Sequence, residues 1–301
     1  MNSLEFRVAT DLEECQALWE KFSPHQTIFQ EWDWRYTHYK YFNYPLKFIV
    51  GYTGNQPIGL LPLEYESAEG YWQFFGGEEM EDNGIWVKPG FENREWEFLR
   101  AVDEPVWLDY LRGDSEFIRG LAIDDVSYEL DLAPYADATD FLENHLTGKL
   151  RKHTRAGQKG VRELKPEIVK NDWKDLEKLF DLNIAVFGAE SSFLDEVVKK
   201  IYRDLVKLPY EWRIFSVRLG GAVKAVTLSV VYKGVYYFYV VGYDRSIKDL
   251  SPFLNLVSID EAKKFGAQKI NFGYHDCGWK ERWGLARIEY HEYYANLVPA
   301  E

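Results

Sequence analysis

Residues 212–284 decide the fold of this chain. They read WRIFSVRLGGAVKAVTLSVVYKGVYYFYVVGY (212–243), DRSIKDLSPFLNLVSIDEAKKFG (244–266) and AQKINFGYHDCGWKERWG (267–284). The first part is rich in Val, Tyr and Phe and is interrupted by short glycine turns, a pattern typical of a β-meander. It predicts three strands: Arg213–Arg218, Ala222–Tyr232 and Val235–Tyr243.

A helix, a short strand and a polar loop follow the meander. Ser251 and Pro252 are typical of a helix start, with a hydroxyl N-cap followed by proline at the first helical position. Gly266 is typical of a helix end. The strand is predicted over Lys269–Phe272, and the loop after it carries His, Asp, Cys, Trp and Lys side chains. This loop is the first place to look for chemistry.

The N-terminal half repeats the same order of elements. A second meander is predicted over Leu46–Tyr52, Pro57–Tyr65 and Tyr71–Phe75. Gly54 precedes Gly220 by 166 residues, and Gly76 precedes Gly242 by the same 166 residues. Repeated spacing without residue identity indicates an ancient duplication. We therefore expect two domains, residues 1–130 and 131–301.

Composition limits the class of protein. The 301 residues have a formal net charge of −13, which argues against a DNA-binding protein and against binding to anionic membranes. Cys15 and Cys277 are the two cysteines, so no disulfide framework is expected. The N-terminus has no secretory signal pattern, and no apolar run approaches the ~20 residues of a membrane span. A cytoplasmic protein is expected.

One segment opposes the acidic character of the chain. Residues 149–162 contain six Lys or Arg residues and no acid. Arg151, Arg155 and Arg162 would share one face of a helix, where arginine can bind phosphate or carboxylate groups with two hydrogen bonds. The simpler alternative is a solvated helix face.

Several short motifs then resemble one family. They are Tyr128–Leu132 with Leu150–Arg155, Gly242-Tyr243-Asp244 with Ser251-Pro252, and Asn271-Phe272-Gly273 with Trp279-Lys280. In this order they resemble the cellulose-biosynthesis (CelD-like) acyltransferases, which stand beside the Fem peptidyltransferases in the GNAT superfamily. The resemblance implies an α+β (mixed α/β) fold of two tandem GNAT-like domains. Each would be a mixed, mostly antiparallel sheet flanked by helices.

The resemblance also implies where a donor binds. In such enzymes the pyrophosphate of acyl-CoA, for example acetyl-CoA, lies at the start of the helix after the meander, where backbone N–H groups and the helix dipole favour an anion. Here that start is Ser251, Pro252 and Phe253, with Arg245 and Lys248 as nearby cations. The loop has no glycine-rich phosphate motif, so an aminoacyl-tRNA donor and a catalytically silent binding module stay open as alternatives.

The polar loop supplies the candidate catalytic residues. His275 or Asp276 would take a proton from an attacking amine, and Lys280 would stabilise an oxyanion. Tyr243, at the end of the meander, is a further candidate. Trp279, together with Arg151 and Arg155, would bind the substrate.

The combined interpretation is an N-acyltransferase that acts on a small-molecule amine such as a sugar or an amino acid. The net charge and the lack of an inserted coiled-coil arm weigh against tRNA as a partner. His275 and Cys277 lack the further ligands that zinc normally has, so no metal is expected.

Overall fold

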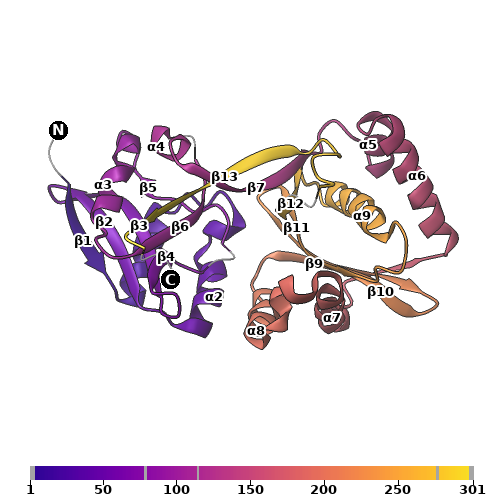
Figure 1. Ribbon diagram of the computed structural model, residues 1–301, viewed down its shortest axis with the longest axis horizontal. Helices are drawn as coiled ribbons and strands as arrows, with labels where there is room; N and C mark the ends of the chain where they lie inside the picture. The colour runs from indigo at the N-terminus through magenta and orange to yellow at the C-terminus, as the bar shows by residue number, and fades with distance from the viewer. Residues whose placement is uncertain (1–3, 78–79, 114, 276–277, 298–301) are drawn as a thin grey trace. The chain divides into compact units, whose positions relative to one another are not determined.

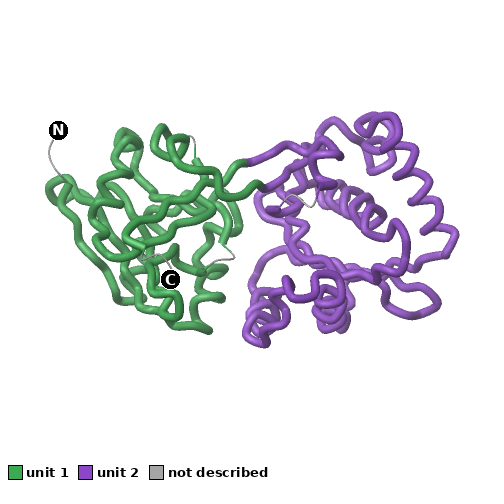
Figure 2. The backbone as a smooth tube through the Cα atoms, in the orientation of Figure 1, with its two compact units in different colours: residues 1–126, 289–301 green, residues 127–288 purple. Residues whose placement is uncertain are grey.

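The structure is a computed structural model that describes residues 4–77, 80–113, 115–275 and 278–297. The chain forms two compact units (Figure 2). Unit 1 contains Met1–Val126 and Glu289–Glu301, and unit 2 contains Ser127–Ile288. The predicted boundary between residues 130 and 131 falls inside the strand β7 (Ala122–Asp131), and the last segment of the chain groups with unit 1.

Unit 1 is built on a mixed sheet with the strand order β1-β2-β3-β4-β6-β13, in which β5 also pairs with β3. Neighbouring strands are antiparallel except for the parallel pair β4 and β6. The strands are β1 (Glu5–Ala9), β2 (Leu46–Thr53), β3 (Gln56–Glu66), β4 (Tyr71–Phe74), β5 (Trp86–Val87), β6 (Val106–Leu111) and β13 (Ala286–Ala295). The helices are α1 (Leu12–Phe22), α2 (Trp32–Phe42), α3 (Glu95–Arg100) and α4 (Glu116–Arg119), with 3-10 turns at Ile28–Gln30 and Glu92–Arg94.

Both faces of the unit 1 sheet are covered. Leu60 on β3 packs with Trp19 of α1 and Trp32 of α2 on one face. The next residue, Leu61, points the other way and packs in the cluster that contains Phe98 of α3. Alternate side chains of a strand face opposite sides of the sheet, so β3 is buried on both.

Unit 2 has the strand order β7-β12-β11-β10-β9-β8. Only β11 and β12 are parallel among the paired neighbours that the structure describes in this unit. The strands are β7, β8 (Glu167–Lys170), β9 (Glu211–Leu219), β10 (Ala222–Tyr232), β11 (Val235–Tyr243) and β12 (Lys269–Tyr274). The helices are α5 (Ala138–Asn144), α6 (Gly148–Glu163), α7 (Leu176–Phe187), α8 (Glu196–Leu205) and α9 (Leu250–Lys264), with 3-10 turns at Trp173–Asp175, Gly188–Glu190 and Ser192–Leu194.

Helices lie on both faces of this sheet as well: α9 on one, and α7 and α8 on the other (Figure 1). On the first face, Phe253 of α9 and Val161 of α6 pack on Phe215 of β9. On the second face, α7 approaches the sheet so closely that a Cβ at Gly242 would lie 2.6 Å from the backbone nitrogen of Asn183. The expected fold class, a mostly antiparallel mixed sheet flanked by helices in each half, is confirmed.

The two units repeat one order of elements. β3 begins at Gln56 and β10 at Ala222, 166 residues apart, and the helix pairs α1–α2 and α7–α8 precede equivalent meanders. The last strand of each repeat, however, pairs in the other unit. β7 follows the first repeat and pairs with β12 in unit 2, whereas β13 ends the second repeat and pairs with β6 in unit 1. Each sheet is therefore completed by a strand from the other repeat.

Two local features complete the fold. Residues 138–163 form two helices, α5 and α6, and not one, because Thr147 is extended and Gly148 has a φ of +51°. The helix α1 is capped by Asp11, whose carboxylate accepts hydrogen bonds from the Glu13 and Glu14 N–H groups.

Candidate functional site

The parallel strands β11 and β12 separate part-way along their length. Their register pairs run from Val235 with Lys269 to Tyr237 with Asn271, and no later pair is formed among the described residues although β11 continues to Tyr243. Gly273, with a φ of +73°, follows in β12. The carboxyl ends of parallel strands are the usual place for ligands in open sheets. The candidate site is therefore the region between the ends of β11 and β12 and the start of α9.

The loop from β11 to α9 is held by Asp244. Its carboxylate accepts hydrogen bonds from the N–H and hydroxyl of Ser246 and forms an ion pair with Lys224 at 2.9 Å. Hydrogen bonds from Ser246 and Lys224 lower the pKa of Asp244 to about 2. Within this ordered loop, Arg245 and Lys248 are exposed, and neither forms an ion pair or a side-chain hydrogen bond with any residue that the structure describes. Both cations are therefore available to an anion.

The helix α9 begins earlier than predicted. Asp249, in the left-handed conformation, is the N-cap, so Ser251 and Pro252 occupy the second and third helical positions. Proline is tolerated there because the first N–H groups of a helix have no intrahelical acceptor. The N–H groups of Leu250 and Phe253 donate to backbone carbonyls. Within the described chain, the Ser251 N–H is the free backbone donor of this turn.

The basic segment forms α6, which packs on the start of α9. A Cβ at Gly157 would lie 2.7 Å from the Cβ of Asp249, so only glycine permits this approach. Arg151 donates to the Glu143 carbonyl, and Arg155 forms an ion pair with the Glu143 carboxylate. These two arginines, predicted to bind substrate, join α5 to α6.

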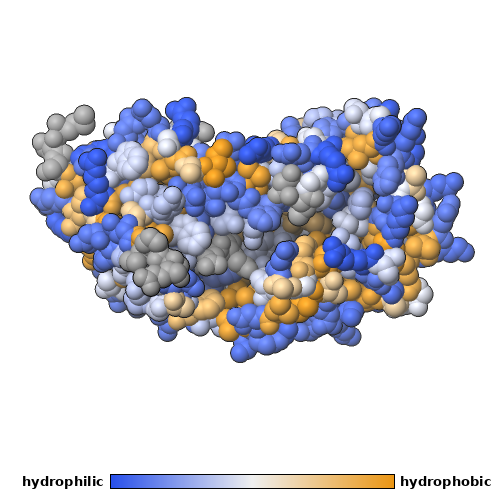
Figure 3. Space-filling model, viewed as in Figure 1, coloured by the Kyte–Doolittle hydropathy of each residue, from blue (hydrophilic) through white to orange (hydrophobic). Residues whose placement is uncertain are grey.

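Other cations of α6 face solvent without a partner among the described residues, namely Lys149, Lys152 and Arg162. The space-filling view shows strongly hydrophilic residues over this helix (Figure 3). A surface depression of about 340 Å³ lies along it, lined by Arg155, Gln158, Lys159, Arg162 and Glu163. The reversal of charge expected from the sequence is thus displayed on the surface of unit 2.

Lys280 lies buried at the end of β12. Its ammonium donates hydrogen bonds to the carbonyl oxygens of Gly273 at 2.8 Å and Tyr274 at 2.6 Å, and it lies 5.4 Å from the ring centroid of Tyr128. This arrangement fixes the bulged end of the strand. His275 is exposed next to it, with a φ of +68°. The predicted residue Asp276 and its neighbour Cys277 lie outside the described residues.

Aromatic rings connect the loop to the sheet. Phe272 of β12 lies 5.7 Å from Phe238 of β11 and 5.4 Å from Trp279, measured between ring centroids. Trp283 is buried, and its carbonyl accepts a hydrogen bond from the imidazole of His145. Trp279 therefore borders the region between β11 and β12, whereas Trp283 anchors the loop.

A buried arginine connects the end of β4 to the neighbouring segments of unit 1. Arg35 is fully buried, and its guanidinium donates to the carbonyls of Phe29, Phe75 and Glu81 and to the amide oxygen of Asn83. Burial lowers the pKa of Arg35 to about 9, opposed by nearby carboxylates. Arg35 is therefore a structural residue of unit 1.

Comparison with known proteins places part of the chain in a family. Residues 147–281 match the model of an acetyltransferase (GNAT) domain. This part of the chain is a GNAT-type domain. The matched residues lie within unit 2 and contain the whole candidate site, and the superfamily resemblance inferred from the motifs is confirmed. No curated protein matches the chain in sequence.

Solved structures show the same fold over nearly the whole chain. FemX is 12% identical, with 97% of this chain and 98% of that chain covered and a TM-score of 0.58. L-PGS from Bacillus licheniformis is 14% identical, with coverages of 96% and 94% and a TM-score of 0.57. A tandem GNAT protein from the clavulanic acid biosynthesis pathway is 12% identical, with coverages of 98% and 100% and a TM-score of 0.55. The tandem arrangement predicted from the repeated spacing is confirmed.

Sequence reasoning missed the residues that position the site. Gly157 and Gly242 allow close backbone approaches, and Asp244 orders the loop. The signal for Gly157 was a glycine inside an otherwise helical pattern, which often marks close packing. Among the described residues, no group of His, Cys, Asp and Glu side chains is placed to hold a metal ion, and no helix is both long and apolar enough to cross a membrane.

Proposed function

We propose that unit 2 is an N-acyltransferase that moves an acyl group from acyl-CoA to the amine of a small molecule. The observation that carries this proposal is the separation of β11 from β12 beside the two unpaired cations Arg245 and Lys248. Backbone groups of a strand without a partner bind extended amide-containing chains, and the pantetheine arm of CoA is such a chain. The cations and the Ser251 N–H would receive its pyrophosphate.

The reaction follows from these positions. The amine nitrogen attacks the thioester carbonyl, the carbon–sulfur bond breaks, and the CoA thiolate leaves. The proton lost by the amine passes to a base, for which His275, Asp276 and Tyr243 are the candidates. Lys280 is the candidate for stabilising the oxyanion, which requires its ammonium to exchange a carbonyl partner for the substrate. Trp279 borders the acceptor.

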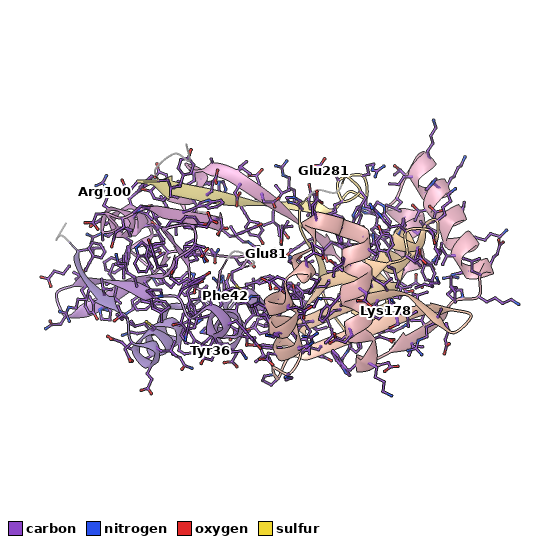
Figure 4. The ribbon with its side chains drawn as sticks, turned by 60° about the horizontal axis from the view of Figure 1, so that its bottom comes forward. Tyr36, Phe42, Glu81, Arg100, Lys178 and Glu281 are labelled. Carbon is purple, nitrogen blue, oxygen red and sulfur yellow. The ribbon has the colours of Figure 1, made fainter. Side chains whose placement is uncertain are left out.

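Calorimetric titration with acetyl-CoA tests the donor. The double variant Arg245→Ala/Lys248→Ala should bind ~10 to 100-fold more weakly than the wild type, because the charge-assisted hydrogen bonds lost at these exposed positions should contribute about 1.5–3 kcal/mol in total. Lys174→Ala/Lys178→Ala removes the same charge from exposed residues near the start of α7 (Figure 4) and should bind normally. Absence of acetyl-CoA binding to the wild type would overturn the proposal.

One observation favours a second candidate, aminoacyl transfer from aminoacyl-tRNA. The unpaired cations of α6 could bind several successive phosphates of an RNA backbone, more than CoA possesses. In that case tRNA would bind with strong salt dependence, and Lys149→Ala/Lys152→Ala/Arg162→Ala would reduce both the affinity and the salt dependence. Acetyl-CoA binding that is unchanged in this variant, together with no tRNA binding, would favour acyl-CoA.

A further inference from the structure

One imidazole connects α5 to the loop after β12. His145, the C-cap of α5, has its Nε2 2.7 Å from the carbonyl oxygen of Trp283 and its Nδ1 2.6 Å from the hydroxyl oxygen of Tyr135. A carbonyl oxygen only accepts, so Nε2 carries the hydrogen, and the Tyr135 hydroxyl donates to Nδ1 of the neutral ring. The partners therefore assign both the tautomer and the orientation of this imidazole.

Aromatic packing holds the imidazole against the loop. The ring of Phe141, one helical turn earlier in α5, stacks on His145 with 4.9 Å between centroids and 20° between planes, and it lies 5.7 Å from the ring of Trp283. Gly284 has a φ of +69°, and a Cβ at this position would lie 2.9 Å from the Nε2 of His145. Glycine after Trp283 therefore gives the imidazole access to the carbonyl.

The carbonyl that His145 binds ends a turn over residues 279–284, which we call the Lys280 turn. Within it, the Trp283 N–H donates to the carbonyl oxygen of Lys280 at 3.2 Å. Glu281, labelled in Figure 4, belongs to the same turn. Because His145 binds the last part of the turn and the turn is closed on itself, the imidazole connects the backbone of Lys280 to α5.

The other end of α5 is fixed to α9. The N–H of Ala138, at the start of α5, donates to the carboxylate of Asp260 on α9 at 2.8 Å. The ammonium of Lys263, also on α9, donates to the carbonyl of Leu132 ahead of α5 at 3.1 Å. The two helices are in contact (Figure 1). The helix α5 therefore connects the two elements that border the candidate site, which are α9 and the Lys280 turn.

We propose that His145 is a positioning residue that holds Lys280 in place for the acyl transfer proposed for unit 2, on which this inference rests. A catalytic group has to be held within about 0.5 Å of its productive position by residues that are themselves locked by packing and hydrogen bonds. His145 meets this condition through Tyr135 and Phe141. It acts on the Lys280 ammonium only through the backbone of the turn.

Two substitutions separate the two nitrogens of the imidazole. In His145→Gln the amide nitrogen takes the place of Nε2 and can still donate to the Trp283 carbonyl. In His145→Asn the amide takes the place of Nδ1 and does not reach that carbonyl. Both variants lose the ring that stacks on Phe141, so packing is changed equally. Leu205→Ala, at a buried position of α8, is the control for general destabilisation.

Nitrogen-15 NMR of the Lys280 ammonium tests its position directly. A buried, hydrogen-bonded ammonium exchanges its protons slowly enough to be observed, and loss of the signal in Lys280→Arg identifies it. Exchange should be about tenfold faster in His145→Asn than in the wild type, and should change less than about threefold in His145→Gln and Leu205→Ala. Equal exchange in the wild type and His145→Asn would overturn the proposal.

The tautomer of His145 is read from the wild type alone, so it decides the matter even if His145→Asn does not fold. The nitrogen-15 shifts of the neutral ring should show the hydrogen on Nε2. A neutral ring with its hydrogen on Nδ1 could not donate to the Trp283 carbonyl and would overturn the proposal.

Turnover separates this inference from the proposed function. With acetyl-CoA as donor and hydroxylamine as the amine, the nitrogen attacks the thioester carbonyl, the carbon–sulfur bond breaks, and the proton lost by nitrogen ends on the CoA thiol. His145→Asn should release thiol about tenfold more slowly than His145→Gln, with equal affinity for acetyl-CoA. Equal rates, or no acceleration by the wild type, would overturn the catalytic role. Absence of acetyl-CoA binding would overturn the proposed function, whereas the exchange measurement would still decide whether His145 positions Lys280.

Discussion

Gly157 of α6 and Asp249, the N-cap of α9, lie in contact: a Cβ at position 157 would be 2.7 Å from both the Cβ and the Cγ of Asp249. The atoms that meet belong to the base of the Asp249 side chain, which cannot move away without the backbone. The start of α9 is therefore positioned by α6, and with it the loop that carries Arg245 and Lys248.

Substitution of two glycines in α6 measures this contact. Gly157→Ala should lower the free energy of unfolding by about 1–3 kcal/mol, the cost of overpacking. Gly160→Ala meets no atom within 4 Å and should instead stabilise the protein by about 0.5–1 kcal/mol, since alanine is the better helix former. Chemical denaturation checks both. Stabilisation by both substitutions would mean that the contact is not rigid.

Lys280→Met tests the buried ammonium. Loss of a charged donor leaves the carbonyls of Gly273 and Tyr274 unpaired, so the unfolding free energy should fall by about 1.5–3 kcal/mol. Lys269→Met, at an exposed position of the same strand, should cost less than about 1 kcal/mol. If Lys280 also stabilises an oxyanion, turnover should fall ~10²-fold while donor affinity stays the same. Equal stability of the two variants would contradict the structural role.

The stability of the protein should depend on pH through Glu64. Glu64 lies buried on β3, and this burial raises its pKa to about 8 in the folded chain from near 4.5 when unfolded, so the folded state binds more protons between these values. Stability contributed by the neutral form is complete below pH 4.5 and is lost as pH rises toward 8. Relative to Glu64→Gln, the wild type should lose roughly 1.4 kcal/mol per pH unit in this range. Parallel pH profiles of the two proteins in urea denaturation would refute this.

Arg35→Lys tests how much the hydrogen bonds of the buried Arg35 guanidinium stabilise unit 1. Lysine has three donors in a different geometry and cannot reach the carbonyls of Phe29, Phe75 and Glu81 together. We expect a loss of about 2–4 kcal/mol, because buried acceptors are left unpaired. Arg94→Lys, which keeps a part-buried ion pair with Glu97 one helical turn away, is the matched control and should change stability by less than about 1 kcal/mol. A lysine variant as stable as the wild type would show that the guanidinium is dispensable.

The meanders, the helix α9 and the duplication were predictable because they rest on local patterns. Gly54 and Gly220, for example, both have positive φ in tight turns, which glycine favours. The start of α9 was predicted two positions late, because Ser251-Pro252 is a strong local signal and the left-handed Asp249 is set by its contact with α6. No local pattern reports such a tertiary constraint.

The candidate site was predictable only as a region. Arg245, Lys248 and Lys280 were found from charge and position, but their partners come from distant segments. That Arg155 pairs with Glu143 depends on how α5 folds back on α6, and the hydrogen bonds of Lys280 depend on the bulge at Gly273. The burial of Glu64 could not be predicted, because the pattern of polar and apolar residues in this strand does not show which side chain is shielded from solvent.

The strand exchange of β7 and β13 has a consequence for synthesis on the ribosome. Domains of a growing chain usually fold from the N-terminus first. Here β6 can pair with β13 only after every other strand of the described chain has been made, whereas β7 is already present when β12 is made. Unit 2 can complete its sheet while β6 of unit 1 still has an open edge, which is a template for unwanted strand pairing. In this chain the first half to be translated is the last to be finished.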